Sequence, residues 1–116
     1  GTWHHLAMTY DGKMMRVYAD GREVAESRVK GDREPGKGPF VIGKRADDYS
    51  HFRGLIDEVR LFRDALPGEA IAYHHDHPGT FATGVREALV RQWSFEADRA
   101  GRAFYEKVMN RAGPTE

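Results

Sequence analysis

The sequence predicts an all-β fold of antiparallel strands, and its alternation of side chains and its turn residues carry that prediction. Side chains alternate between two faces over residues 3–10 and again over residues 13–19, which is the period of a strand. Asp-Gly pairs at positions 11–12 and 20–21 separate these segments from each other and from residues 23–29. Such pairs favour type I′ hairpin turns because both residues tolerate a positive φ. We therefore expect a three-stranded antiparallel meander.

Residues 52–62 are expected to form one long, largely covered central strand. Apolar side chains fall on both of its faces, with Leu55, Val59 and Leu61 on one and Ile56 and Phe62 on the other. Asp57 is in step with the first group, where burying a carboxylate is costly unless donors or a cation meet it. Asp57 is therefore the residue of this strand that most needs an explanation.

The segments around the central strand are expected to be loops, one brief strand and one short helix. Residues 30–39 hold three glycines and two prolines and should form a surface loop. A brief strand at 40–43 and a polar loop at 44–51 follow. After the central strand, Pro67 and Glu69 mark the first turn of a helix that runs to about residue 73.

The C-terminal tail fits two descriptions. Apolar residues recur at spacings of three and four, as on one face of a helix, at Val85, Leu89, Trp93, Ala97, Ala100, Phe104 and Val108. Residues 89–96 also alternate as a strand does. Both descriptions stay open on periodicity alone.

Composition limits the classes of partner. A chain of 116 residues forms one domain at most. Its 18 basic and 18 acidic residues balance, so no net field attracts nucleic acid or an anionic membrane. Cysteine is absent, and no apolar run reaches the roughly 18 residues of a membrane span. The chain opens directly in a predicted strand, so we expect it to be part of a longer protein.

Five segments together resemble a known family. They are Trp-His-His-Leu-Ala-Met-Thr-Tyr-Asp-Gly at 3–12, Val-Tyr-Ala-Asp-Gly at 17–21, Val-Ile-Gly at 41–43, Phe-Arg-Gly-Leu-Ile-Asp-Glu-Val-Arg-Leu at 52–61, and Ala-Leu at 65–66 with Glu-Ala-Ile at 69–71. Their order and spacing are similar to the laminin G-like branch of the concanavalin A-like lectin and glucanase jelly rolls. The resemblance implies a partial jelly-roll β-sandwich that corresponds to the family's second half.

The resemblance also gives a domain organisation. Residues 1–73 are expected to be a laminin G-like half-sandwich, residues 74–84 a linker, and residues 85–116 a tail. Family members open with a strand close to the closing strand, and Trp93 to Glu96 resembles such an opening, which favours the strand description there. A half-sandwich leaves sheet edges uncovered, so we expect self-association or completion by a partner.

Asp57 is the best candidate for a metal ligand. The resemblance implies a structural calcium ion near the matching aspartate, with Glu96 of the tail as a second ligand. Calcium takes six to eight oxygen ligands, and the loop before the central strand offers only a few. The alternative is that Asp57 caps backbone N–H groups at a strand bulge.

Catalysis is not expected. Asp57 and Glu58 are adjacent and would point to opposite faces, unlike the paired carboxylates of a glycosidase. His74, His75 and His77 suggest a metal cluster, but a solvated turn explains them more simply. Arginines near residues 45–63 are interleaved with acidic residues, which argues against nucleic-acid binding.

The function that the sequence favours is non-catalytic recognition or adhesion. We expect an exported or cell-surface parent protein whose module binds a glycan or a protein surface. Loops at 44–51 and 30–39 would make the contact, with Arg45, Tyr49 and His51 as ligand-binding residues. A purely structural or assembly domain without a ligand is the alternative.

Overall fold

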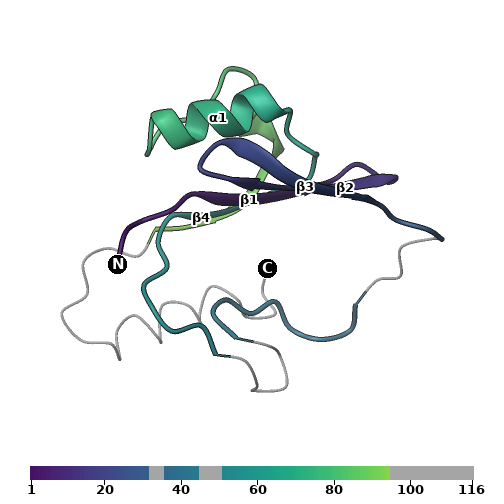
Figure 1. The fold of residues 1–116 in the computed structure, drawn as a ribbon, viewed down its shortest axis with the longest axis horizontal. Coiled ribbons are helices and arrows are strands. Elements are labelled where there is room, and N and C mark those ends of the chain that lie inside the picture. Colours follow the sequence, from purple (N-terminus) through teal and green to yellow (C-terminus); the bar gives the residue numbers. More distant parts are fainter. Residues whose placement is uncertain (32–35, 45–50, 95–116) are drawn as a thin grey trace. The chain divides into compact units, whose positions relative to one another are not determined.

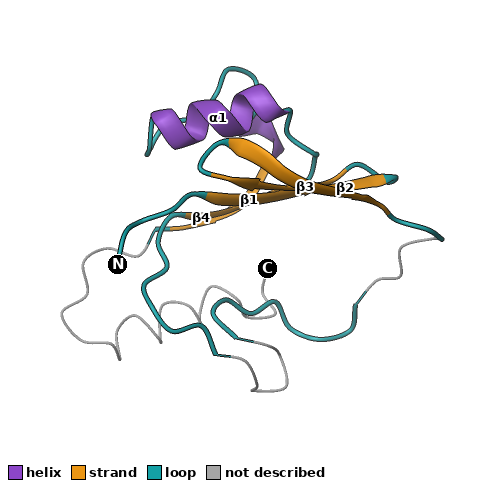
Figure 2. Cartoon of the chain, viewed as in Figure 1, coloured by secondary structure: helices purple, strands orange, loops and turns teal. Residues whose placement is uncertain are grey.

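The computed structural model describes residues 1–31, 36–44 and 51–94. Their elements in chain order are β1 (Leu6–Tyr10), β2 (Met14–Ala19), β3 (Arg22–Arg28), β4 (Val59–Phe62), α1 (Gly68–Asp76), a single 3₁₀ turn η1 (Arg86–Ala88) and β5 (Leu89–Trp93) (Figures 1 and 2). Strands dominate, and α1 is the one α-helix among the described residues. The all-β prediction is confirmed.

The described residues form two compact units. The first, which we call the meander unit, contains residues 1–31 and 61–91. The second, the Trp93 unit, contains residues 36–44, 51–60 and 92–94. Strands β1, β2 and β3 form one sheet in that order, and β4 and β5 form a separate two-stranded sheet.

The meander has the predicted antiparallel arrangement. β1 pairs with β2 from Leu6 opposite Ala19 to Tyr10 opposite Met15. β2 pairs with β3 with a register shift between Val17 and Tyr18, which is a β-bulge or similar irregularity. Such a shift locally increases twist and lets one strand gain a residue on its partner.

The two hairpin turns differ. Asp20 and Gly21 both have positive φ, 52° and 84°, as a type I′ turn requires, so this prediction is confirmed. In the first turn the positive φ lies at Gly12 alone, at 97°, and the predicted type I′ geometry is wrong there. Instead, the Asp11 carboxylate accepts the backbone N–H groups of Lys13 and Met14, at 2.9 and 2.8 Å, and fixes the turn from outside its centre.

Helix α1 covers one face of the meander, as Figure 1 shows. Tyr18 and Thr9 on that face are 6% and 9% exposed. A Cβ atom added at Gly68 would lie 3.6 Å from the Tyr18 ring, so the start of α1 packs on this strand. On the opposite face, Leu6 and Met8 remain 73% and 66% exposed. One side of the sheet is therefore an apolar surface open to solvent.

The predicted central strand is shorter than expected. Only Val59–Phe62 form β4, and the residues before it have no regular secondary structure. Glu58 has a φ of 51°, which a continuous strand does not allow. Leu55 and Phe52 are 76% and 57% exposed, so the prediction that residues 52–62 are covered on both faces is wrong for its first half.

Trp93 is the core of the second unit. It is 1% exposed, packs against Ile42, Ile56 and Val59, and stacks on Phe40 with ring centroids 5.1 Å apart. Residues 89–93 are strand β5, so the strand description of the tail is confirmed for the part that is described. The helical pattern after residue 94 falls outside the described residues. The predicted short helix is present and extends to Asp76 rather than ending near residue 73.

Replacement of Gly21 by alanine should destabilise the protein more than the same change at Gly12. Both glycines have positive φ, so either alanine costs about 1–2 kcal/mol of backbone strain. At Gly21 the new Cβ would also lie 3.3 Å from the Ala72 Cα and the His75 Cβ, whereas at Gly12 it meets nothing within 4 Å. Urea unfolding of both variants measures the difference. Equal losses would show that α1 does not rest on this turn.

Candidate functional site

The structure describes one of the three predicted ligand-binding residues. Of the three, His51 is described and exposed, while Arg45 and Tyr49 fall outside the described residues. The Phe52 N–H donates a hydrogen bond to the Gly43 carbonyl oxygen at 2.6 Å, which joins the two ends of residues 44–51.

Aromatic side chains flank this loop. Phe52 is 57% exposed. Phe40 is 44% exposed although its ring stacks on Trp93, and the predicted strand at residues 40–43 is wrong because these residues form no strand. Exposed aromatic rings offer flat apolar surface for contact with a ligand. His51, which precedes Phe52 in the sequence, is exposed as well.

Asp57 is exposed, so the prediction of a buried carboxylate is wrong. The physical reason is the absence of a regular strand before Val59, which removes the expected alternation. The Asp57 Oδ1 accepts the N–H of Glu58 at 2.8 Å, which is the kind of backbone contact that the capping alternative expects. The second predicted metal ligand, Glu96, lies outside the described residues, and so its distance from Asp57 is not part of the structure.

Glu58 is the carboxylate that organises the Trp93 unit, and the sequence did not single it out for this role. Its Oε1 accepts a hydrogen bond from the Ser94 hydroxyl at 2.7 Å, and its Oε2 accepts one from Gln92 Nε2 at 3.2 Å. The residues on either side of Trp93 are therefore both held by one carboxylate. The polar residues Gln92 and Ser94 on either side of Trp93 indicate that a polar group faces this side of the strand, but they do not identify Glu58 as that group.

Three or more metal-binding side chains do not converge anywhere within residues 1–31, 36–44 and 51–94. The His74 to His77 segment is not the solvated turn that was expected, because His74 and His75 belong to α1. His74 is 8% exposed, and its Nε2 accepts the Ala82 N–H at 2.9 Å. His77 stacks on Tyr73 with ring centroids 4.2 Å apart. These histidines hold the end of the helix together.

Asp20 is the polar centre of the meander unit. Its Oδ2 lies 2.9 Å from His4 Nδ1, and its Oδ1 accepts the backbone N–H of His5 at 2.9 Å. The Asp20 N–H in turn donates to the His5 carbonyl oxygen at 2.7 Å. The hydrogen bond from His4, followed by that from the His5 backbone, lowers the pKa of Asp20 below its ordinary value of 3.8. These contacts hold His4 and His5, which precede β1, against the turn.

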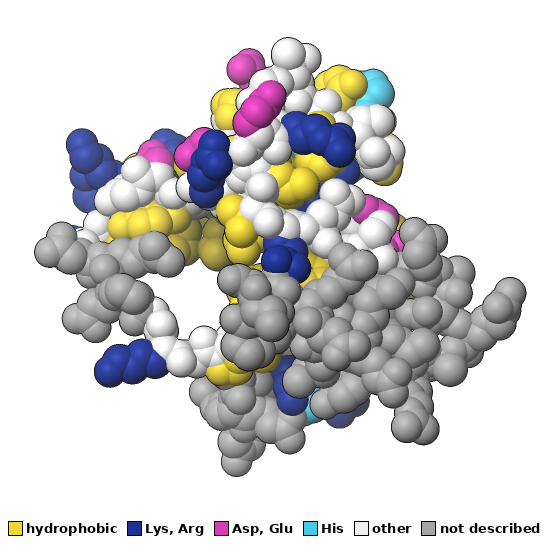
Figure 3. Space-filling view, turned by 180° about the vertical axis from the view of Figure 1, so that it is seen from behind, with side chains coloured by type: hydrophobic (Ala, Val, Ile, Leu, Met, Phe, Trp, Pro, Cys, Tyr) yellow, Lys and Arg dark blue, Asp and Glu magenta, His cyan; other side chains and the backbone are white. Residues whose placement is uncertain are grey.

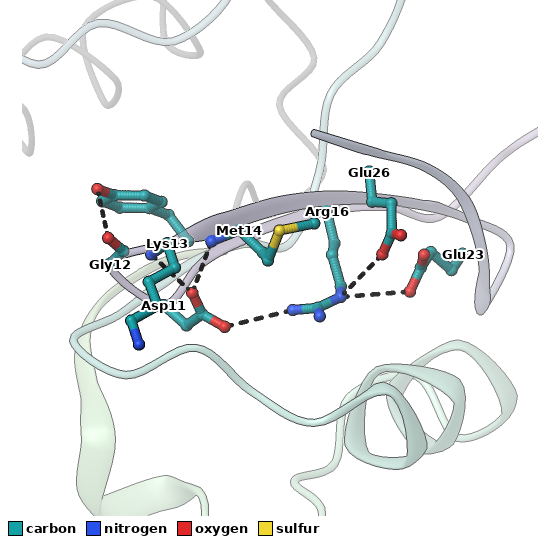
Figure 4. A network of polar contacts seen from close by, with 8 residues as sticks. Asp11, Gly12, Lys13, Met14, Arg16, Glu23 and Glu26 are labelled. Atoms are coloured by element: carbon teal, nitrogen blue, oxygen red, sulfur yellow. Dashed lines mark hydrogen bonds and ion pairs between the residues drawn. The ribbon is translucent and has the colours of Figure 1, made fainter. Parts of the chain in front are cut away.

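A second polar network lies on the meander around Arg16 (Figure 4). Its guanidinium is 3.4 Å from Asp11 Oδ2 and 3.6 Å from both Glu23 Oε1 and Glu26 Oε2. Hydrogen bonds from the Met14 and Lys13 N–H groups, more than the arginine, lower the pKa of Asp11. The two glutamates face a shared cation, so they are arranged for ion pairing, and exposed pairs of this kind contribute about 0–1 kcal/mol each.

Charges of both signs are interleaved over the described surface. Figure 3 shows Lys and Arg side chains beside Asp and Glu, with hydrophobic side chains exposed between them. None of the described helices is long and apolar enough to cross a bilayer.

Comparison with known proteins assigns the family. Residues 1–72 match a laminin G-like model described as the concanavalin A-like lectin/glucanases superfamily. The chain belongs to this superfamily. Its fold class is accordingly a partial all-β jelly-roll sandwich, as the sequence resemblance implied. Laminin G-like domains are in general binding or structural modules.

Three similar proteins show how much of this chain, and how much of each relative, is matched. The chain is 35% identical over 69 residues to the human collagen alpha-1(XVIII) chain and 31% identical over 98 residues to mouse pappalysin-1. These matches cover 55% and 80% of the chain but only 4% and 6% of those proteins. A crystal structure of an S-layer domain-containing protein from Clostridium thermocellum aligns with 24% identity and a TM-score of 0.49, over 65% of this chain and 40% of that one.

Asp20 should make stability fall at acid pH. Because its pKa is lowered in the folded state, its contribution is present above pH 3.8 and is lost as the pH falls through the folded pKa. An NMR titration of the Asp20 carboxyl is expected to give a midpoint below 3.8, and His4→Ala should raise that midpoint. Asp20→Asn should unfold with a weaker pH dependence in this range. An Asp20 midpoint that does not move in His4→Ala would contradict the assignment.

Proposed function

We propose that the chain is a non-catalytic recognition or adhesion module of a larger exported protein. It belongs to a superfamily whose laminin G-like members bind proteins or glycans or serve as structural units. The proposal places ligand contact at residues 44–51 and at the neighbouring loop of residues 30–39.

The observation that supports this placement is the closed base of the first loop. The hydrogen bond from Phe52 to Gly43 fixes both ends of the loop on the Trp93 unit, and exposed Phe52 and His51 stand at its end. In the proposed complex, Tyr49 and Phe52 contact the apolar face of a sugar or a protein side chain. Arg45 and His51 supply hydrogen bonds that orient it.

A non-catalytic role is proposed because several described carboxylates already have partners within the chain. Glu23 and Glu26 approach Arg16, and both oxygens of Glu58 accept hydrogen bonds. A glycosidase needs two carboxylates that face a substrate across a short gap. An extracellular or cell-surface location of the parent protein is proposed alongside, since a collagen chain is among the similar proteins.

A structural role is the second candidate, and the open face of the meander favours it. Leu6 and Met8, together with Trp3 at 65% exposure, present apolar side chains to solvent. Exposed apolar patches mark interaction surfaces in soluble proteins. In this alternative, the module packs against neighbouring domains of its parent protein and binds no separate ligand.

Calcium remains a proposal for Asp57. The described residues near it provide few of the six to eight oxygens that calcium takes, so residues 45–50 and Glu96 would have to supply others. If the ion binds, added calcium should raise the melting temperature, and Asp57→Asn should abolish the rise because bound ligand stabilises the folded state. Differential scanning calorimetry with calcium and with a chelator measures this. A melting temperature that is the same in both conditions would exclude the site.

Ligand recognition should depend on the loop and not on the meander. On a glycan array and in a pull-down from extracellular matrix extract, Tyr49→Ala and Arg45→Ala should lower binding by roughly tenfold or more each, as removal of a hot-spot contact does. Met8→Ser, on the open face of the meander, is the matched control and should bind normally. If Met8→Ser instead loses binding while Tyr49→Ala and Arg45→Ala bind normally, the structural role is favoured.

A further inference from the structure

Strand β3 is an edge of the meander sheet. The sheet order is β1-β2-β3, so β3 pairs with β2 alone among the described residues. All seven residues of β3 are exposed. An edge strand presents unpaired backbone N–H and C=O groups, to which a further strand can add. The outer side of β3 is therefore a surface on which another strand can pair.

The register with β2 identifies the backbone groups on this outer side. The Val29 N–H donates to the Lys13 carbonyl oxygen at 2.8 Å, so Val29 faces β2. Residues 25–28 pair with β2 in the same register. The backbone groups of successive residues in an antiparallel strand point to opposite sides. The N–H and C=O groups of Glu26 and Arg28 therefore point away from β2.

Two features that usually protect an edge strand leave this part of β3 accessible. The register shift leaves Val24 without a partner in β2, but residues 25–29 after it pair regularly. Charged side chains are present at Glu26 and Arg28, but their charges are opposite and they lie two residues apart. Such a pair repels few strands and attracts one that carries the same two charges in reverse order.

The two charges are incompletely neutralised within the chain. Arg28 makes no ion pair with any of the described residues. Glu26 lies 3.6 Å from Arg16, which Asp11 and Glu23 also approach (Figure 4). The Glu26 side chain is 52% exposed. Because side chains two residues apart share a face of a strand, Glu26 and Arg28 present a carboxylate and a guanidinium side by side at the edge.

We propose that β3 pairs with the β3 strand of a second copy of the chain, antiparallel and centred on Ser27. In this register Glu26 of each copy lies opposite Arg28 of the other, and the outward N–H and C=O groups of both residues meet. A slip of two residues in either direction places Glu26 opposite Glu26 or Arg28 opposite Arg28. A slip of one residue turns inward backbone groups toward outward ones. The sequence of β3 thus selects both its partner and its register.

This pairing also extends the apolar surface of the meander. Glu26 and Arg28 keep the same face in both copies, so the open faces with Leu6 and Met8 lie on one side of a continuous sheet, with three strands from each copy. The inference does not rest on ligand binding by residues 44–51.

Charge reversal in the full-length chain tests the proposal. Glu26→Lys and Arg28→Glu each place like charges opposite one another, so each variant alone should dimerise roughly tenfold more weakly than wild type in sedimentation equilibrium. An equal mixture of the two variants should recover the wild-type affinity, because each reversed residue then meets an opposite charge. This recovery cannot come from variants that fail to fold. Arg22→Glu, at the other end of β3, is the matched control and should dimerise as wild type.

Amide hydrogen exchange reports the strand pairing itself. As the concentration of the wild-type chain rises, the N–H groups of Glu26 and Arg28 should exchange more slowly, and that of Ser27, which already faces β2, should change less. A chain that stays monomeric at millimolar concentration would overturn the proposal. A dimer that is unaffected by both charge reversals but lost in Met8→Glu would also overturn it, since such a dimer forms through the open face of the meander.

Discussion

The described residues bury little apolar surface, and this holds for both compact units. Trp93 is its largest fully buried side chain, and it supplies the core of one unit almost alone. In the other, α1 covers one face of a three-stranded sheet while Leu6 and Met8 stay mostly exposed. Buried apolar area drives folding. With less of it than in a closed sandwich, the stability of the fold depends more on local hydrogen bonds, ion pairs and turn geometry.

The turn at Asp20 is an example of such local polar contacts, and the sequence predicted the turn itself. An Asp-Gly pair between two alternating segments defines the hairpin through local conformational preferences alone. The same aspartate then binds His4 and His5, and Gly21 leaves room for α1. The sequence did not reveal these last contacts, because they join segments whose approach depends on how the helix docks.

The central segment was predicted less well for a related reason. Alternation of apolar residues suggested a strand through Asp57, but Glu58 adopts a positive φ that ends it. The conformation is stabilised by partners 34 and 36 residues away, Gln92 and Ser94. No local pattern contains that information. Of the predicted site, His51 is described and exposed, while the role of the loop stays a prediction. The sequence also did not indicate that Glu58 would accept hydrogen bonds from Gln92 and Ser94.

The position of Trp93 links the fold to the family resemblance. Trp93 lies next to the closing strand, where the family resemblance placed an opening strand, yet it follows that strand in the sequence instead of preceding it. Its indole N–H has no hydrogen-bond partner in the described residues, so apolar contact alone holds this side chain. Because Trp93 also lies on a strand that pairs with β4, the strand pairing and the apolar contacts together determine where the closing strand lies.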